Sequence, residues 1–208
     1  SLNEFKIIFY WEYAHRLLAR LIGLFFLFPL IYFLFFKKIN KKIVYPCLVI
    51  MFLIFTQGFV GWYMVKSGLI DNPDVSQYRL TAHFSAAVVI YGYMFWVALS
   101  LMKAPFGAVR KASNGLVAAT VVTTIWIFVT MMSGGFVAGL DAGLTYNTYP
   151  LMDGDIVPDG LWAMSPWYLN LFENITTVQF NHRILAHLTV LWVFGIWWLV
   201  RKSELPMS

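Results

Sequence analysis

The sequence predicts an all-α polytopic membrane protein, built as a bundle of transmembrane helices. Hydrophobic residues make up 60% of the 208-residue chain and charged residues only 12%, which is far from the usage of soluble domains. The mean hydropathy is +0.70. Because a single segment in lipid can satisfy its own backbone hydrogen bonds only as a helix, each long apolar run is expected to be helical and surrounded by membrane lipid.

Five apolar stretches have the length and the lack of charge of transmembrane helices. They cover residues 17–36, 44–65, 80–102, 116–139 and 184–200. The longest connection, residues 140–179, is rich in Gly, Pro, Asn, Asp and aromatic residues, which predicts a structured cap with turns, and it is called the cap segment below. Its Trp and Tyr side chains are expected at the level of the lipid headgroups.

Basic residues separate the connections into two sides. They gather after the first, third and fifth spans, at Lys37, Lys38, Lys41 and Lys42, at Lys103, Arg110 and Lys111, and at Arg201 and Lys202. Nine of the ten acidic residues fall on the opposite side. The positive-inside rule therefore predicts an outer N-terminus and an inner C-terminus. The net charge of +5 serves orientation in this arrangement, and no nucleic-acid partner is expected.

All four histidines fall near predicted outer ends of spans: His15, His83, His182 and His187. Ionisable groups at membrane depth are costly and usually face the bundle interior with a partner. Imidazole is a standard axial ligand of heme iron, and histidines from two helices can hold a porphyrin between them. The lone Cys47, by contrast, excludes a disulfide framework or a cysteine metal cluster within the chain.

Three of the histidines share a local pattern, with an alanine four positions deeper and an arginine toward the water. The three sets are His15 with Arg16 and Ala19, His83 with Arg79 and Ala87, and His182 with Arg183 and Ala186. Residues one turn apart share a helix face, so the alanine leaves room for a flat macrocycle and the arginine can meet its propionates. The alternative is that each histidine is an interfacial, hydrogen-bonded residue. His187 lies on a different face from His182 and is expected to be structural.

Two motifs place small and polar residues near the outer ends of the second and fourth spans. They are Thr56-Gln-Gly-Phe-Val-Gly61 and Ser133-Gly-Gly-Phe-Val-Ala-Gly139. Close helix packing of the small-xxx-small type is the favoured interpretation. The alternative is a backbone that approaches a ligand plane.

Six motifs in order along the chain resemble heme A synthase of the mitochondrial and proteobacterial type. They are Glu12-Tyr-Ala-His-Arg16, Gln57-Gly-Phe-Val-Gly-Trp-Tyr-Met-Val-Lys-Ser-Gly-Leu69, Arg79-Leu-Thr-Ala-His83, Gly134-Gly-Phe-Val-Ala-Gly-Leu-Asp-Ala-Gly143, Tyr146-Asn-Thr-Tyr-Pro-Leu-Met-Asp-Gly154 and Asn181-His-Arg183. The resemblance implies conversion of a methyl group of heme O to the formyl group of heme A, in the bacterial or mitochondrial inner membrane. It also implies eight spans in two four-helix halves, the first span and the last two having no counterpart in this chain.

The resemblance assigns roles to individual residues. Residues 1–111 would form most of the N-terminal half, where His15 and His83 hold the heme O substrate. Residues 112–208 would begin the C-terminal half, where His182 is one of two ligands to a b-type heme cofactor. Glu12 matches the family's functional carboxylate, and Arg16, Arg79 and Arg183 are candidate propionate partners.

Two other functions use the same histidines. A non-catalytic b-type cytochrome would pass electrons to or from quinone, and a heme-transport or oxidase-assembly scaffold would need no turnover. Glu12 and the six motifs favour the enzyme. Its expected partners are an electron donor and either heme O synthase or cytochrome oxidase assembly factors.

The topology can be tested by labelling single cysteines introduced at Lys41, Asp74 and Asp153 after replacement of Cys47. Positions 74 and 153 should react with a membrane-impermeant reagent added from outside, and position 41 should not, because basic loops stay on the inner side. Outer labelling at position 41 would contradict both the span map and the shared histidine layer.

Overall fold

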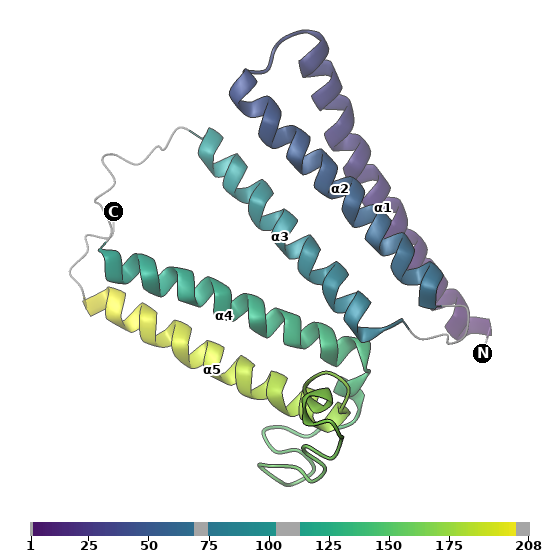
Figure 1. The fold of residues 1–208 in the computed structure, drawn as a ribbon, viewed down its shortest axis with the longest axis vertical. Coiled ribbons are helices and arrows are strands. Elements are labelled where there is room, and N and C mark those ends of the chain that lie inside the picture. The colour runs from purple at the N-terminus through teal and green to yellow at the C-terminus, as the bar shows by residue number, and fades with distance from the viewer. Residues whose placement is uncertain (1, 69–74, 103–112, 203–208) are drawn as a thin grey trace. The chain divides into compact units, whose positions relative to one another are not determined.

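The computed structural model describes residues 2–68, 75–102 and 113–202, and in these ranges the chain is helical without named strands (Figure 1). The elements are α1 (Leu2–Phe35), α2 (Lys41–Gly68), α3 (Gln77–Leu101), α4 (Asn114–Gly139), the short 3₁₀ helices η1 (Ala142–Leu144) and η2 (Trp167–Leu171), and α5 (Ile175–Lys202). Asp74, Lys103, Arg110, Lys111 and the predicted boundary at residues 111–112 lie outside the described residues.

Each α-helix is long and apolar enough to cross a membrane, which confirms the five predicted spans. All five helices begin before the predicted spans, and two of them begin more than two turns earlier. The apolar window opens at residue 17 in the first span and 184 in the fifth, whereas α1 begins at Leu2 and α5 at Ile175. Charged and polar residues continue both helices beyond the apolar window, so a prediction from hydrophobicity alone misses these turns.

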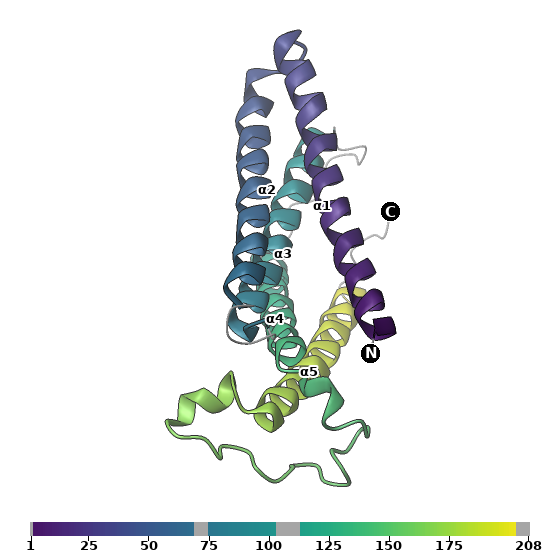
Figure 2. The ribbon, with the colours of Figure 1, turned by 90° about the vertical axis from the view of Figure 1, so that its right-hand side faces the viewer.

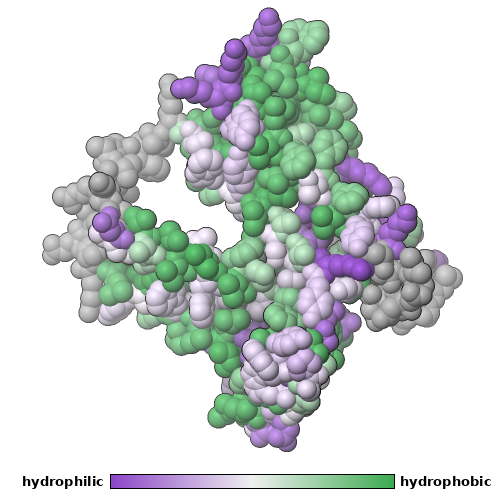
Figure 3. All heavy atoms as spheres, in the orientation of Figure 1, coloured by the Kyte–Doolittle hydropathy of each residue, from purple (hydrophilic) through white to green (hydrophobic). Residues whose placement is uncertain are grey.

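Large apolar side chains remain exposed along all five helices. Hydrophobic residues cover most of the helical surface visible in Figure 3. In water such a surface would cause aggregation, but in a bilayer these side chains face acyl chains or neighbouring helices. The chain is therefore an integral membrane protein.

The described residues form two compact units, and the boundary between them crosses α3. The first unit contains α1, α2 and the part of α3 from Ala86 onward. Its buried side chains are Leu30, Ile50, Met51 and Val97. The turn between α1 and α2 uses Lys37 in the left-handed region, with φ of 52°, and the Asn40 side chain accepts a hydrogen bond from the Lys42 amide at 3.0 Å.

The second unit contains the beginning of α3, with α4, the cap segment and α5. Helices α4 and α5 run side by side in both ribbon views (Figures 1 and 2). Polar side chains link them at three levels, through Trp192 and Thr123 (3.0 Å), Thr130 and Thr189 (2.9 Å), and Ser133 and His182 (2.8 Å). Hydrogen bonds of this kind help helices associate where lipid removes the hydrophobic driving force.

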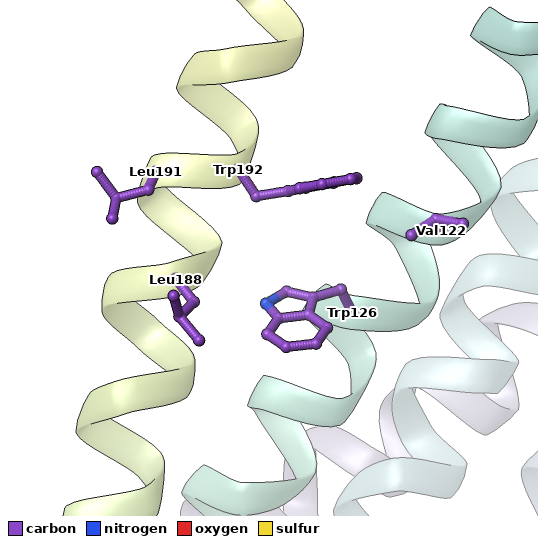
Figure 4. Close-up of a pocket in the computed structure, with 5 residues that line it drawn as sticks. All are labelled: Val122, Trp126, Leu188, Leu191 and Trp192. Carbon is purple, nitrogen blue, oxygen red and sulfur yellow. The ribbon is translucent and has the colours of Figure 1, made fainter.

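Beside these polar links lies an apolar groove, shown in Figure 4. Its lining comes from α4 and α5, and consists of Val122, Trp126, Leu188, Leu191 and Trp192. The groove lies deeper along both helices than Ser133 and His182.

The cap segment folds around one buried amide, that of Asn170, which is 0% exposed. Its Nδ2 donates to the carbonyls of Met164 and Trp167, both at 2.8 Å. Its Oδ1 accepts from the Met164 amide at 2.9 Å and from Asn174 Nδ2 at 3.0 Å. The Asn174 side chain also caps α5 by accepting from the Thr177 amide at 3.1 Å. The predicted structured cap is therefore present, and it ends at Asn174, where α5 begins.

The beginning of α3 packs tightly on the glycines of α4. A Cβ atom added at Gly139 would lie 2.6 Å from the Cα of Gln77, and one at Gly135 would lie 2.9 Å from Oγ1 of the buried Thr81. This confirms close helix packing at the second small-residue motif. At the first motif, a Cβ at Gly58 meets no atom within 4 Å in the described part of the chain.

Gly139→Ala should destabilise the α3–α4 contact, because backbone atoms of Gln77 occupy the place of the new methyl group. We expect a loss of about 1–3 kcal/mol, the usual range for overpacking, seen as a lower thermal unfolding midpoint in detergent. Gly115→Ala is the matched control in the same helix, since its Cβ would meet nothing within 4 Å. Equal midpoints for the two variants would contradict the packing described.

Candidate heme-binding site

The three patterned histidines occupy the same depth in their own spans. The membrane-spanning parts of α1, α3 and α5 begin at Phe9, Gln77 and Ile175. His15 and His83 each follow six residues after that start, and His182 follows after seven. The extra helical turns at the start of α1 and α5 place His15 and His182 inside their spans, as His83 is in α3. Each histidine lies one and a half to two turns after the start of its span.

His182 has the most defined surroundings of the three. Its Nδ1 lies 2.8 Å from the hydroxyl oxygen of Ser133, which belongs to the neighbouring helix α4. Gly134 lies beside the ring, and a Cβ added there would be 3.1 Å from Cε1 and 3.6 Å from Nε2. The absence of a side chain at Gly134 therefore lets the imidazole ring pack closely against the backbone of α4.

His83 is partly buried on α3, two residues after the buried Thr81 that contacts Gly135. It belongs to the second unit, whereas His15 is exposed on α1 in the first unit. The pairing of His15 and His83 across one heme stays a prediction, because the two histidines belong to different compact units.

Glu12 and Arg16 meet as expected for residues one turn apart. Arg16 Nη2 donates to Glu12 Oε1 at 2.7 Å, and about half of each side chain is exposed (49% for Glu12, 47% for Arg16). An ion pair this exposed contributes at most about 1 kcal/mol to stability. The pair therefore leaves the carboxylate accessible for another role.

Arg183 holds the cap segment to α5. Its Nη1 donates to the carbonyls of Thr148 (2.8 Å) and Leu151 (3.3 Å), and its Nη2 donates to the carbonyl of Tyr146 at 2.6 Å. The Tyr146 carbonyl also accepts from Gln179 Nε2 at 3.0 Å. Sequence reasoning assigned Arg183 only to a propionate and missed these backbone partners. Its predicted propionate role, like those of Arg16 and the partly buried Arg79, stays untested.

His187 contacts the same part of the cap segment. Its Nε2 lies 2.9 Å from the hydroxyl oxygen of Tyr149, and the two rings stack at a centroid distance of 5.7 Å. This contact is of the structural kind expected from its different helix face. The sequence assigned no role to Tyr149 or to Ser133. Each nevertheless lies in a motif quoted above, Tyr149 in residues 146–154 and Ser133 in residues 133–139.

Heme ligation needs a different donor set from the binding of a bare metal ion. Within residues 2–68, 75–102 and 113–202, no three His, Cys, Asp or Glu side chains gather to hold a metal. Axial ligation of heme needs only one imidazole from each of two helices, because the porphyrin supplies the other ligands. His182, with Nδ1 on Ser133, could supply one of these two imidazoles, and its role as a ligand stays a prediction.

Comparison with known proteins extends over the entire chain. Residues 1–207 match the model of the COX15-CtaA family, described as cytochrome oxidase assembly protein. The chain is 49% identical to heme A synthase of Nitrosospira multiformis, 46% to that of Nitrosomonas eutropha and 46% to that of Parvibaculum lavamentivorans. Each alignment covers 100% of this chain but only 58%, 59% and 60% of the respective relative. No solved structure matches.

Arg183→Met should loosen the cap segment, since three carbonyls lose a charged donor. Hydrogen bonds to charged groups contribute about 1.5–3 kcal/mol to stability. The backbone amides of Met152 and Asp155 bond to each other's carbonyls within the cap segment. Their amide hydrogens should therefore exchange with solvent about 10-fold faster or more. Arg183→Lys keeps the charge without the planar fork and should be intermediate. Unchanged exchange in Arg183→Met would leave only the propionate role.

Proposed function

Because the chain belongs to the COX15-CtaA family of cytochrome oxidase assembly proteins, we propose that the full-length protein oxidises a methyl group of heme O to the formyl group of heme A. The 49% identity with a heme A synthase over the whole of this chain carries the proposal. The histidines at one depth of three spans support it, because they are the residues that the reaction needs to hold heme.

Each half of the protein has its own task in this proposal. His15 and His83 hold the heme O substrate, and His182 holds a b-type heme. A heme bound by these residues would supply the redox chemistry. The chain itself supplies ligation, orientation and electrostatics, as proteins do for cofactors that carry the difficult chemistry.

Glu12 is the proposed acid-base group. It lies one turn before His15, and its half-exposed carboxylate forms an ion pair with Arg16 that contributes little to stability. Conversion of a methyl to a formyl group is a four-electron oxidation, for which an oxidant outside the chain is required, and Glu12 would accept protons released in it. A positioned acid-base group of this kind typically contributes about 100-fold or more to the rate.

The activity can be tested directly by expressing the full-length gene in a host that accumulates heme O and extracting the pigments. Appearance of heme A is the expected result. A protein that binds heme with the spectrum of bis-histidine ligation but yields no heme A would instead be a non-catalytic b-type cytochrome.

Glu12→Gln separates catalysis from binding in the same host. The change keeps size and removes charge, so heme content and the bis-histidine spectrum should survive while heme A output falls about 100-fold. Glu173→Gln is the matched control, since Glu173 accepts a hydrogen bond from the Tyr78 hydroxyl at 2.9 Å and an amide oxygen can do the same. Near-normal heme A from Glu12→Gln at matched expression would remove Glu12 from the mechanism.

A further inference from the structure

The contact between Ser133 and His182 determines more than the position of the ring. Ser133 Oγ lies 2.7 Å from the carbonyl oxygen of Thr130 and 2.8 Å from His182 Nδ1. A serine hydroxyl has one proton, and a carbonyl oxygen can only accept. If the proton is donated to Thr130, the hydroxyl oxygen must accept a proton from Nδ1 of the imidazole.

The opposite assignment leaves an unfavourable contact. If the hydroxyl donated to Nδ1, its oxygen would face the Thr130 carbonyl oxygen at 2.7 Å with no proton between them. The contacts of Ser133 with the Thr130 carbonyl and with His182 are therefore both hydrogen bonds only when Nδ1 carries the proton.

We propose that Ser133 is a positioning residue that fixes His182 in the Nδ1–H tautomer and leaves the Nε2 lone pair for heme iron. The proposal rests on the proposed function, because it concerns the heme held by His182. Histidines that bind metals usually donate their second ring N–H to a protein acceptor, which fixes the ring and makes it a stronger ligand. Gly134 contributes by letting the imidazole lie close to the α4 backbone, since a Cβ there would be 3.1 Å from Cε1.

Ser133→Ala in the full-length protein tests this role through heme itself. Loss of such an outer partner typically weakens metal binding about 10–100-fold, so the ratio of heme to protein after purification should fall. Any heme that remains at this site should show an altered low-spin electron paramagnetic resonance signal. Its midpoint potential should rise, because a less polarised imidazole stabilises ferric iron less.

Two further variants separate positioning from helix stability. Ser133→Thr keeps the hydroxyl and should restore the heme ratio, the signal and the potential. Thr124→Ala removes another α4 hydroxyl, one that donates to the Thr120 carbonyl at 2.9 Å, and should change nothing.

The inference is overturned if Ser133→Ala keeps the heme ratio, the resonance signal and the midpoint potential of the parent protein. It is also overturned if Ser133→Thr fails to restore these three quantities, or if Thr124→Ala loses as much heme as Ser133→Ala. A parent protein without any low-spin heme would instead refute the proposed function.

Discussion

The second unit depends on the close approach of α4 to its two neighbours. Lipid provides no hydrophobic force between helices, so contact must come from small residues and interhelical hydrogen bonds. Gly135 and Gly139 bring α4 against α3, while Ser133 and Gly134 receive His182 of α5. Any side chain at these glycines would separate the helices or push the imidazole away. One short motif thus provides both the helix packing and the position of the His182 ring, while its approach to a ligand plane stays a prediction.

The cap segment extends this order to the membrane surface. Asn170 fills its hydrogen-bonding capacity within the segment, and Arg183 and His187 fasten the segment to α5. An irregular backbone beside a membrane needs such partners, because unsatisfied carbonyls there cost several kcal/mol. His182 and His187 therefore have different duties on one helix. The first faces α4 and the second faces the cap segment.

Hydrophobicity predicted the five spans because apolar length is dictated by the bilayer. It missed the first turns of α1 and α5, where charged and polar residues continue the helix. The depth of the histidines followed from the same spans, and Glu12 and Arg16 met because helical spacing is local. The partners of His182 and Arg183 could not be predicted. They depend on how α5 rotates against α4 and on the path of an irregular segment, and neither leaves a periodic signal in the sequence.

The central claim is that His182 is a heme ligand while His187, five residues later on the same helix, is structural. The most direct test is the ratio of heme to protein in purified full-length His182→Ala and His187→Ala, measured by the absorbance of the pyridine complex of the extracted heme. The account predicts a lower ratio for His182→Ala and the parent ratio for His187→Ala. A parent ratio in His182→Ala, or an equal loss in both variants, would contradict it.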